Sequence, residues 1–391
     1  MSEYWFGSPG TGLRTALPDP RPFLARVRAG LSESETALVI RQLYGLWLVA
    51  LLLKALGSSW DVSWHFKWLR DDLAPPHLIN VVGDVVMIGL VVFHTVTGFG
   101  VDKLALRLMQ VGSAVFLVSI PIDVINHRVN GLDITSWSFS HSGLYLGTAL
   151  AIAGAIVGWT RHATGQRRRT LVLGTLWLFF LENVLFPNQQ QEYGTLALSA
   201  YLDGRTTAEP SLLAFAANQL GVAALDESSF RSFALPIADW VYLAWVTTAG
   251  MIVLVIARRQ LGVRWAATAI AGAYVAYRCV MFVLLAGSGF TRSIVPFLLL
   301  AGAVAIDLVC AAGLPWAVEG LVGAAVVATA VYAGGWAQGE LIALPPSTYV
   351  LAPAAAGVLA VGWLAAAALQ KAWGTTERVP ATAPAGPPLA A

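Results

Sequence analysis

Residues 37–58 read ALVIRQLYGLWLVALLLKALGS, and after a polar corner residues 78–98 read LINVVGDVVMIGLVVFHTVTG. Each stretch is long enough to cross the apolar core of a bilayer as a helix, because a core of about 30 Å needs roughly 20 residues. In the whole chain 57% of residues are hydrophobic and 12% are charged, whereas soluble domains carry about 25% charged residues. This composition predicts an all-α, polytopic membrane helix bundle.

The same measure gives ten candidate transmembrane spans: 37–58, 78–98, 104–122, 142–160, 170–187, 236–257, 264–286, 293–312, 317–335 and 350–370. Lys and Arg gather before the first span, after the second, fourth and sixth spans, and in the tail. Short cytoplasmic loops carry an excess of these residues. Ten spans therefore predict a multi-pass protein of a bacterial-type inner (plasma) membrane with both termini in the cytoplasm.

The predicted spans divide the chain into four regions. A cytoplasmic N-terminal segment precedes a four-helix unit, which is followed by a six-helix membrane region with a long outer loop and by a low-complexity tail that we expect to be disordered. The corresponding ranges are 1–36, 37–160, 161–370 with its loop at 188–235, and 371–391.

Two polar triplets lie at the ends of predicted spans, and they contain four of the six His in the chain: Asp61, His65 and His77, then Asp123, His127 and His141. An Asp and a His four positions apart lie on one face of a helix, and a corner can return the second His to the same place. Two imidazoles and a carboxylate suit copper, iron or zinc. One such pair is explained by an interfacial hydrogen bond, but two copies in the same order favour metal binding.

The two triplets make the first four spans a tandem two-helix repeat. The first triplet joins spans one and two and the second joins spans three and four, so both are expected at the outer face. Each copy also has a Gly six residues after its last His, Gly83 and Gly147. Small residues at such positions allow helices to approach closely.

Other ionisable residues fall inside the apolar runs, where they are costly and often functional. Asp84 lies seven residues after the last His of the first triplet, on the same helix face, so it is a candidate additional ligand, a partner of a ligating imidazole, or a helix–helix hydrogen-bonding group. Glu182, near the outer end of the fifth span, is placed to face the site or to carry protons. Arg278 is expected to pair with Asp307 or Asp239.

The triplets resemble two copper sites in the C subunit of the particulate methane and ammonia monooxygenases, with patterns D-x3-H-x12-H and N-x3-H-x13-H. In this chain the spacings are three and eleven residues, then three and thirteen, and Asp123 stands where the family has Asn. The resemblance covers about residues 40–160. It implies a copper-dependent membrane monooxygenase or a relative, copper-ligand roles for both triplets, and partner subunits that supply electrons or further metal sites.

The leading hypothesis is therefore an integral-membrane metalloprotein, a copper- or iron-dependent monooxygenase acting on a small apolar or lipid-dissolved substrate. A membrane transporter or channel, including one for a metal ion, is the alternative, because many spans, a repeat and intramembrane charges also fit it. A haem protein with His axial ligands and a subunit without a site are further interpretations. The chain has no long basic run for nucleic acid, its main partner is the lipid bilayer, and an oligomer is compatible with the sequence.

Overall fold

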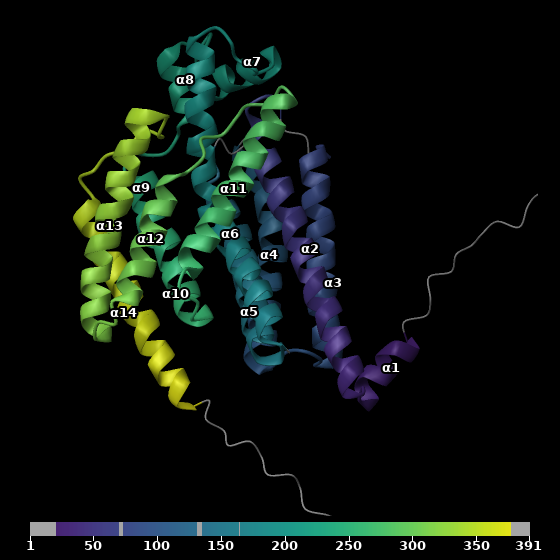
Figure 1. The fold of residues 1–391 in the computed structure, drawn as a ribbon. Helices are drawn as coiled ribbons and strands as arrows, with labels where there is room; N and C mark the ends of the chain where they lie inside the picture. Colours follow the sequence, from purple (N-terminus) through teal and green to yellow (C-terminus); the bar gives the residue numbers. More distant parts are fainter. Residues whose placement is uncertain (1–20, 70–72, 131–134, 164, 377–391) are drawn as a thin grey trace, which may run out of the picture.

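The computed structural model describes residues 21–69, 73–130, 135–163 and 165–376, and the regular elements within these ranges are helices (Figure 1). Most of the predicted N-terminal segment and of the predicted disordered tail lies outside the described residues. The helices are α1 (Arg21–Ala29), α2 (Glu33–His65), α3 (Pro75–Thr97), α4 (Lys103–Asn130), α5 (Phe139–His162), α6 (Gln166–Leu202), α7 (Pro210–Gln219), α8 (Glu227–Ala234), α9 (Val241–Trp245), the π-helical turn η1 (Val246–Gly250), α10 (Met251–Leu261), α11 (Ala266–Gly287), α12 (Leu298–Ala311), α13 (Trp316–Leu341) and α14 (Ala352–Thr376).

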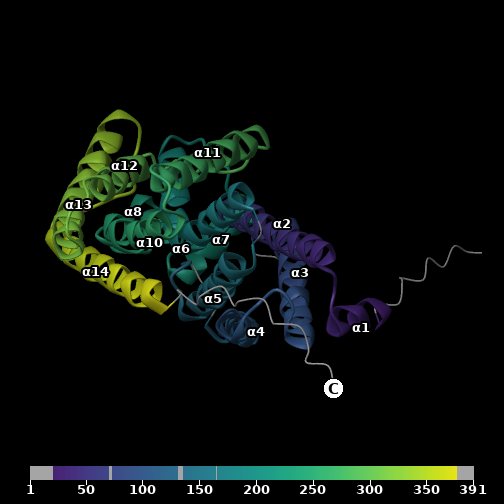
Figure 2. The same ribbon diagram turned by 60° about the horizontal axis from the view of Figure 1, so that its bottom comes forward.

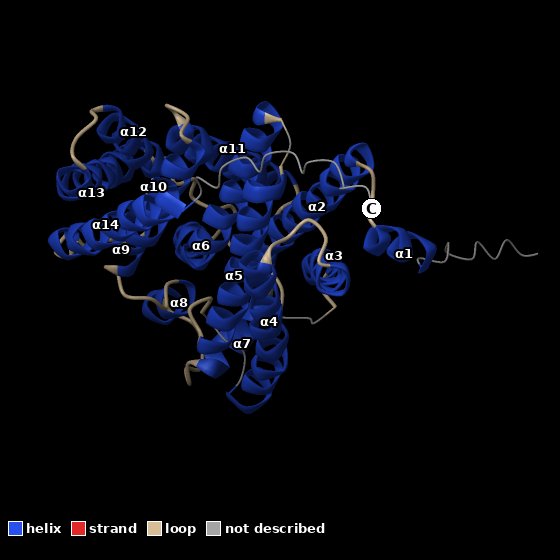
Figure 3. Cartoon of the chain, turned by 90° about the horizontal axis from the view of Figure 1, so that it is seen from below, coloured by secondary structure: helices blue, strands red, loops and turns tan. Residues whose placement is uncertain are grey.

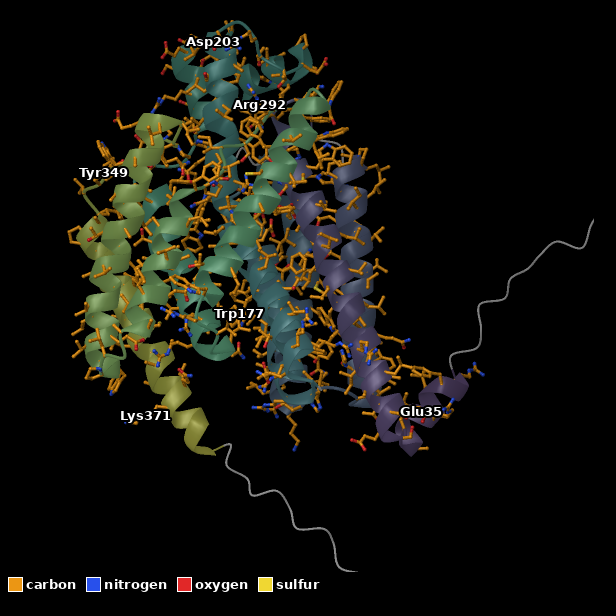
Figure 4. All side chains as sticks on the ribbon, in the orientation of Figure 1. Glu35, Trp177, Asp203, Arg292, Tyr349 and Lys371 are labelled. Carbon is orange, nitrogen blue, oxygen red and sulfur yellow. The ribbon has the colours of Figure 1, made fainter. Side chains whose placement is uncertain are left out.

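The length and composition of these helices confirm the predicted polytopic membrane bundle. Among the described residues, nine helical stretches are long and apolar enough to cross a membrane: α2, α3, α4, α5, α6, the continuous α9–η1–α10 segment, α11, α13 and α14. The shorter apolar helix α12 is the tenth candidate. Asp203 lies at one end of the bundle, and Glu35 and Lys371 lie at the other (Figure 4).

The predicted span at 293–312 differs from the other nine, because only α12 within it is helical. At 1.5 Å per residue a helix of this length is shorter than a bilayer core. The non-helical residues before α12 are bonded to other parts of the protein: Ser63 Oγ donates to the carbonyl of Thr291 at 2.6 Å, and Gln338 Nε2 donates to that of Val295 at 3.1 Å. Non-helical backbone at membrane depth is tolerated where protein surrounds it in this way.

Helix α6 is longer than the span predicted at 170–187, since it continues to Leu202. The connection that follows therefore starts after Leu202 instead of at residue 188, and it contains the short helices α7 and α8. The cause is the polar run NQQQE at 188–192, which suggests a surface loop but is buried inside the protein. Asn188, Gln189 and Glu192 form hydrogen bonds with residues of neighbouring helices, so the helix continues past Pro187.

The bundle is built around α6. Helices α2 and α3 pack as one pair and α4 and α5 as another, and α6 packs against α2, α5, α10 and α11. The views from below show the two pairs on one side of α6, and α12, α13 and α14 on the other (Figures 2 and 3). A single cluster of buried apolar side chains extends through both sides. Helix α6 therefore joins the two parts of the bundle.

The two glycines of the repeat lie where the helices of each pair touch. A Cβ atom on Gly83 would lie 2.7 Å from the carbonyl oxygen of Ala50 on α2, and one on Gly147 would lie 2.6 Å from the amide nitrogen of Phe116 on α4. Both positions therefore need glycine if the backbones are to stay this close. The close packing sets the height at which the start of α3 meets the end of α2, and likewise for α5 and α4.

Candidate metal centres

The first triplet closes across the corner between α2 and α3. Asp61 and His65 lie one turn apart at the C-terminal end of α2, and His77 lies in the first turn of α3, which begins with two prolines that suit a helix start. Asp61 Oδ1 is 2.7 Å from His77 Nε2 and 3.6 Å from His65 Nε2. The three candidate ligand atoms lie within 4.8 Å of one another, as the spacing predicted.

The second triplet closes across the corner between α4 and α5. Asp123 Oδ2 is 3.4 Å from His127 Nδ1, and Asp123 Oδ1 is 3.4 Å from His141 Nε2. His141 lies in the first turn of α5, where its backbone N–H donates to the N-cap side chain of Ser138 at 3.3 Å. These candidate ligand atoms also lie within 4.8 Å of one another. Both predicted triplets are therefore assembled by the fold, as two separate groups.

Neighbouring groups orient the second triplet. Ser140 Oγ donates to Asp123 Oδ1 at 2.8 Å. Nδ1 of His141 lies 3.2 Å from the carbonyl oxygen of Thr135, which favours a proton on Nδ1 and leaves the Nε2 lone pair directed at Asp123. Metal-binding imidazoles are commonly held in this way through their other ring nitrogen. The donor atoms and their orientation therefore fit a divalent transition metal.

Both triplets border one cavity of about 490 Å³. Five of the six triplet side chains line it: Asp61, His65, His77, Asp123 and His141. Asp84 and Glu182, the two further residues singled out in the sequence, line it as well. The cavity walls come from α2, α3, α4, α5 and α6, and residues of α7 and α8 line it as well. The fold thus brings the two corners of the repeat to one cavity.

Asp84 lines this cavity but belongs to neither triplet. It forms an ion pair with Lys54 of α2, and the Lys54 ammonium also lies 4.6 Å from the centre of the Phe116 ring. Nearer the first triplet, Asn80 Nδ2 donates to Ser58 Oγ at 3.3 Å. Lys54 was missed in the sequence analysis, although it lies seven residues before the Asp of the first triplet and so faces the same side of α2.

Glu182 contributes a carboxyl group from α6 to the same cavity. The side chain is buried, and its Oε1 accepts a hydrogen bond from Gln189 Nε2 at 3.2 Å. The Gln189 Oε1 in turn accepts from Ser59 Oγ of α2 at 3.3 Å, and Tyr277 of α11 donates to Ser59 Oγ at 2.8 Å. Glu182 is therefore one end of a buried hydrogen-bond chain that links three helices.

The predicted partners of Arg278 are wrong. Its guanidinium lies 2.8 Å from Glu192 of α6, while Asp307 lies 2.8 Å from Arg258, at the opposite end of the bundle. Tyr242 also donates to Glu192, at 3.0 Å. Glu192 escaped the sequence analysis because it was placed in an outer loop, and its true position follows only from the length of α6.

Comparison of the chain with protein-family models, with curated proteins and with solved structures found no match. The class of protein that the fold and the site define is a multi-pass helical membrane protein with two groups of potential metal ligands. Its function is therefore inferred from these groups and from the cavity that they share.

Proposed function

We propose that this chain is a membrane metalloprotein that holds a copper ion, or an iron ion, at each triplet and oxidises a lipid-dissolved substrate with oxygen. One observation carries the proposal: two sets of one carboxylate and two imidazoles each converge within 4.8 Å, and both sets border one cavity. One triplet alone would be explained as a polar group of side chains at a helix corner. Two such sets around one space are suited to a reaction.

Copper is the preferred metal for this donor set. It binds more tightly than the other first-row divalent ions to a given nitrogen and oxygen site, and iron is suited to two imidazoles and one carboxylate with open positions. When bound, such a metal supplies one-electron and oxygen chemistry. The resemblance of residues 40–160 to the copper membrane monooxygenases supports the same choice, and it supports a partner subunit as the source of electrons.

The side chains of the cavity have defined parts in this proposal. The triplets hold the ions, and apolar side chains such as Phe116, Phe179 and Phe186 exclude water from the space between them. Glu182 Oε1, at the end of its hydrogen-bond chain, is the atom that takes or releases a proton at the cavity wall.

The triplet end of the bundle is proposed to face outward. Helix α1 and the C-terminal end of α14 lie at the opposite end from α7 and α8 (Figure 1), and the basic residues Arg258 and Arg259 close α10 at the same end as α1. An excess of Lys and Arg marks the cytoplasmic side of a bacterial inner membrane. On this basis both described ends are cytoplasmic.

A transporter or channel is supported less well by the shape of the cavity. Beyond the Lys54–Asp84 pair, α2 and α3 are packed together by Leu51, Met87 and Leu90, all of which are buried in the apolar core. This packing favours a cavity with a closed inner end over a continuous path across the bilayer. Metal-dependent ion flux into liposomes that contain the purified chain would favour transport instead.

The test of the proposal is the metal content of protein purified from membranes at native loading. We expect two ions per chain, and we expect His65→Ala and His127→Ala each to lose one of them because each removes a ligand from a different triplet. Copper bound at the two sites would be identified by elemental analysis and electron paramagnetic resonance. His162→Ala, at the other end of α5, is the control and should keep both ions.

Two results would overturn the proposal. One is the absence of metal from the wild-type chain, and the other is the same metal content in His65→Ala, His127→Ala and wild type. Oxygen uptake in the presence of a chemical reductant is the second measurement, and it should be lost in the variant that carries both substitutions.

A further inference from the structure

Two exposed residues that line the cavity point to a side opening between α3 and α4. Among the residues that line it, Val81 of α3 is 53% exposed and Ile120 of α4 is 42% exposed, while Trp68, just beyond the end of α2, is 36% exposed. Helix α3 packs mainly on α2, and α4 packs mainly on α5, so the two helices belong to different pairs of the repeat. Both exposed side chains lie on helices that are long and apolar enough to span a membrane, so they face the lipid.

This opening lies just below both triplets. Val81 is four residues along α3 from His77, and Ile120 is three residues along α4 from Asp123. At 1.5 Å per residue these separations correspond to about 6 and 4.5 Å along the two helices. A molecule that enters here therefore comes from the hydrocarbon of the bilayer and meets both triplets at once.

The outer side of the cavity is covered by the short helices that follow α6. Leu212 and Phe215 of α7 and Phe233 of α8 line the cavity, and α7 and α8 lie above the bundle at this end (Figure 1). Phe66, the residue that follows α2, packs against Phe233 with ring centres 6.2 Å apart. Apolar side chains thus cover part of the cavity on its outer side, and the side opening offers a lipid-soluble molecule a route from the bilayer.

The cavity is too large to bind only a small gas molecule. The cavity measures about 490 Å³, within the range of roughly 300–1,000 Å³ that binds drug-sized ligands. A water molecule occupies about 30 Å³ of the liquid, so a molecule of one or two carbons would leave most of this space to be filled by something else. Phe116, Phe179 and Leu144 make much of the wall apolar.

We propose that the cavity binds an uncharged, chain-like molecule drawn directly from the bilayer, with one end beside the two triplets. The molecule is uncharged because the opening is flanked by Val81 and Ile120 at membrane depth, where a charged group is costly. The claim that this molecule is the substrate rests on the proposed function. Its binding to the cavity can be measured without turnover or metal.

The experiment uses a long-chain alcohol that carries a photoreactive diazirine, added to the full chain in lipid nanodiscs. We expect light to attach it to peptides that contain cavity residues, and an excess of unlabelled alcohol to prevent this. Val81→Trp and Ile120→Trp should reduce the labelling of cavity peptides to the level seen with competitor, because each places a bulky ring at the opening.

Matched controls come from the same two helices. Val92 is 55% exposed on α3 and Ile122 is 40% exposed on α4, and neither lines the cavity, so Val92→Trp and Ile122→Trp should label as wild type does. Equal labelling of the Val81→Trp and Ile120→Trp variants and wild type, or labelling spread evenly over lipid-facing peptides, would overturn the inference. Metal content of the same samples separates the two proposals: metal without cavity labelling contradicts only this inference, and labelling without metal contradicts only the proposed function.

Discussion

Asp61 and Asp123 hold equivalent places in the repeat, but their surroundings differ. Asp123 is buried and accepts a hydrogen bond from Ser140 Oγ at 2.8 Å, and the imidazole of His141 is held through its second nitrogen by Thr135. Asp61 is only partly buried. A ligand set that is held by neighbouring groups binds metal more tightly, so Ser140 and Thr135 are expected to strengthen the second site.

Removing the hydroxyl of Ser140 should weaken the second site alone. Loss of a group that orients a ligand typically reduces metal affinity by about 10–100-fold, so Ser140→Ala should release one ion per chain at chelator concentrations that leave the other bound. Competition with a chromophoric chelator measures this. Ser142→Ala is the matched control, because the exposed Ser142 hydroxyl bonds only within its own helix, to the carbonyl of Ser138. Equal affinities in both variants would contradict the assigned role.

Among the elements, the helix pairs decide whether each triplet can close. The backbones of α4 and α5 approach so closely that a Cβ on Gly147 would lie 2.6 Å from the amide nitrogen of Phe116 and 2.7 Å from the carbonyl oxygen of Gly112. The equivalent contact in the other pair is made by Gly83. Because neither backbone can yield as a flexible side chain would, each glycine holds its pair at the separation that the ligands need.

Gly147→Ala should therefore push α4 and α5 apart. We expect a loss of stability of about 1–3 kcal/mol, as for other overpacked interiors, together with loss of the ion from the second triplet and retention of the ion at the first. Thermal unfolding in detergent and metal analysis measure the two effects. On α3, a Cβ at Gly89 would meet nothing within 4 Å, so Gly89→Ala should change neither. Wild-type behaviour of Gly147→Ala would show that the close approach is not needed.

At the scale of the whole molecule, the polar run of α6 connects the repeat to the remaining helices. Gln190 Oε1 accepts from Ser136 Oγ, at the corner of the second triplet, at 3.1 Å. Glu192 bonds to Arg278 of α11 at 2.8 Å and to Tyr242 of α9 at 3.0 Å. These buried contacts join segments that are far apart in the chain, so the two parts of the bundle are expected to unfold together.

Arg278→Leu tests this connection, because it leaves Glu192 buried without its cation. Removing one partner of a buried ion pair costs about 3–5 kcal/mol, so thermal unfolding should occur at a markedly lower temperature. Adding Glu192→Leu should restore most of the stability, since an apolar pair of similar volume is often tolerated. The exposed Arg292 provides the control, Arg292→Leu. A similar small effect of both single substitutions would argue against an energetic role for the pair.

Local pattern was enough to predict the transmembrane character and both triplets. Helical spacing places Asp61 with His65, and Asp123 with His127, on one face without any knowledge of the rest of the chain. The apolar runs likewise predicted the positions of most membrane helices. The eighth span was predicted less well because Ser63 and Gln338 bond to backbone carbonyls before α12. The end of the fifth span was predicted less well because Arg278 pairs with Glu192 inside the bundle.

The sequence by itself therefore determined the helical membrane class of this protein and the composition of two candidate metal sites, because the class follows from long apolar runs and the Asp–His pairs follow from helical spacing. The tertiary structure alone decided that the two sites share a cavity, that Asp84 pairs with Lys54, and that Glu192 pairs with Arg278. The physical reason is burial: a polar side chain inside the bundle must find a partner, and only the packing of helices distant in sequence determines which partner is within reach.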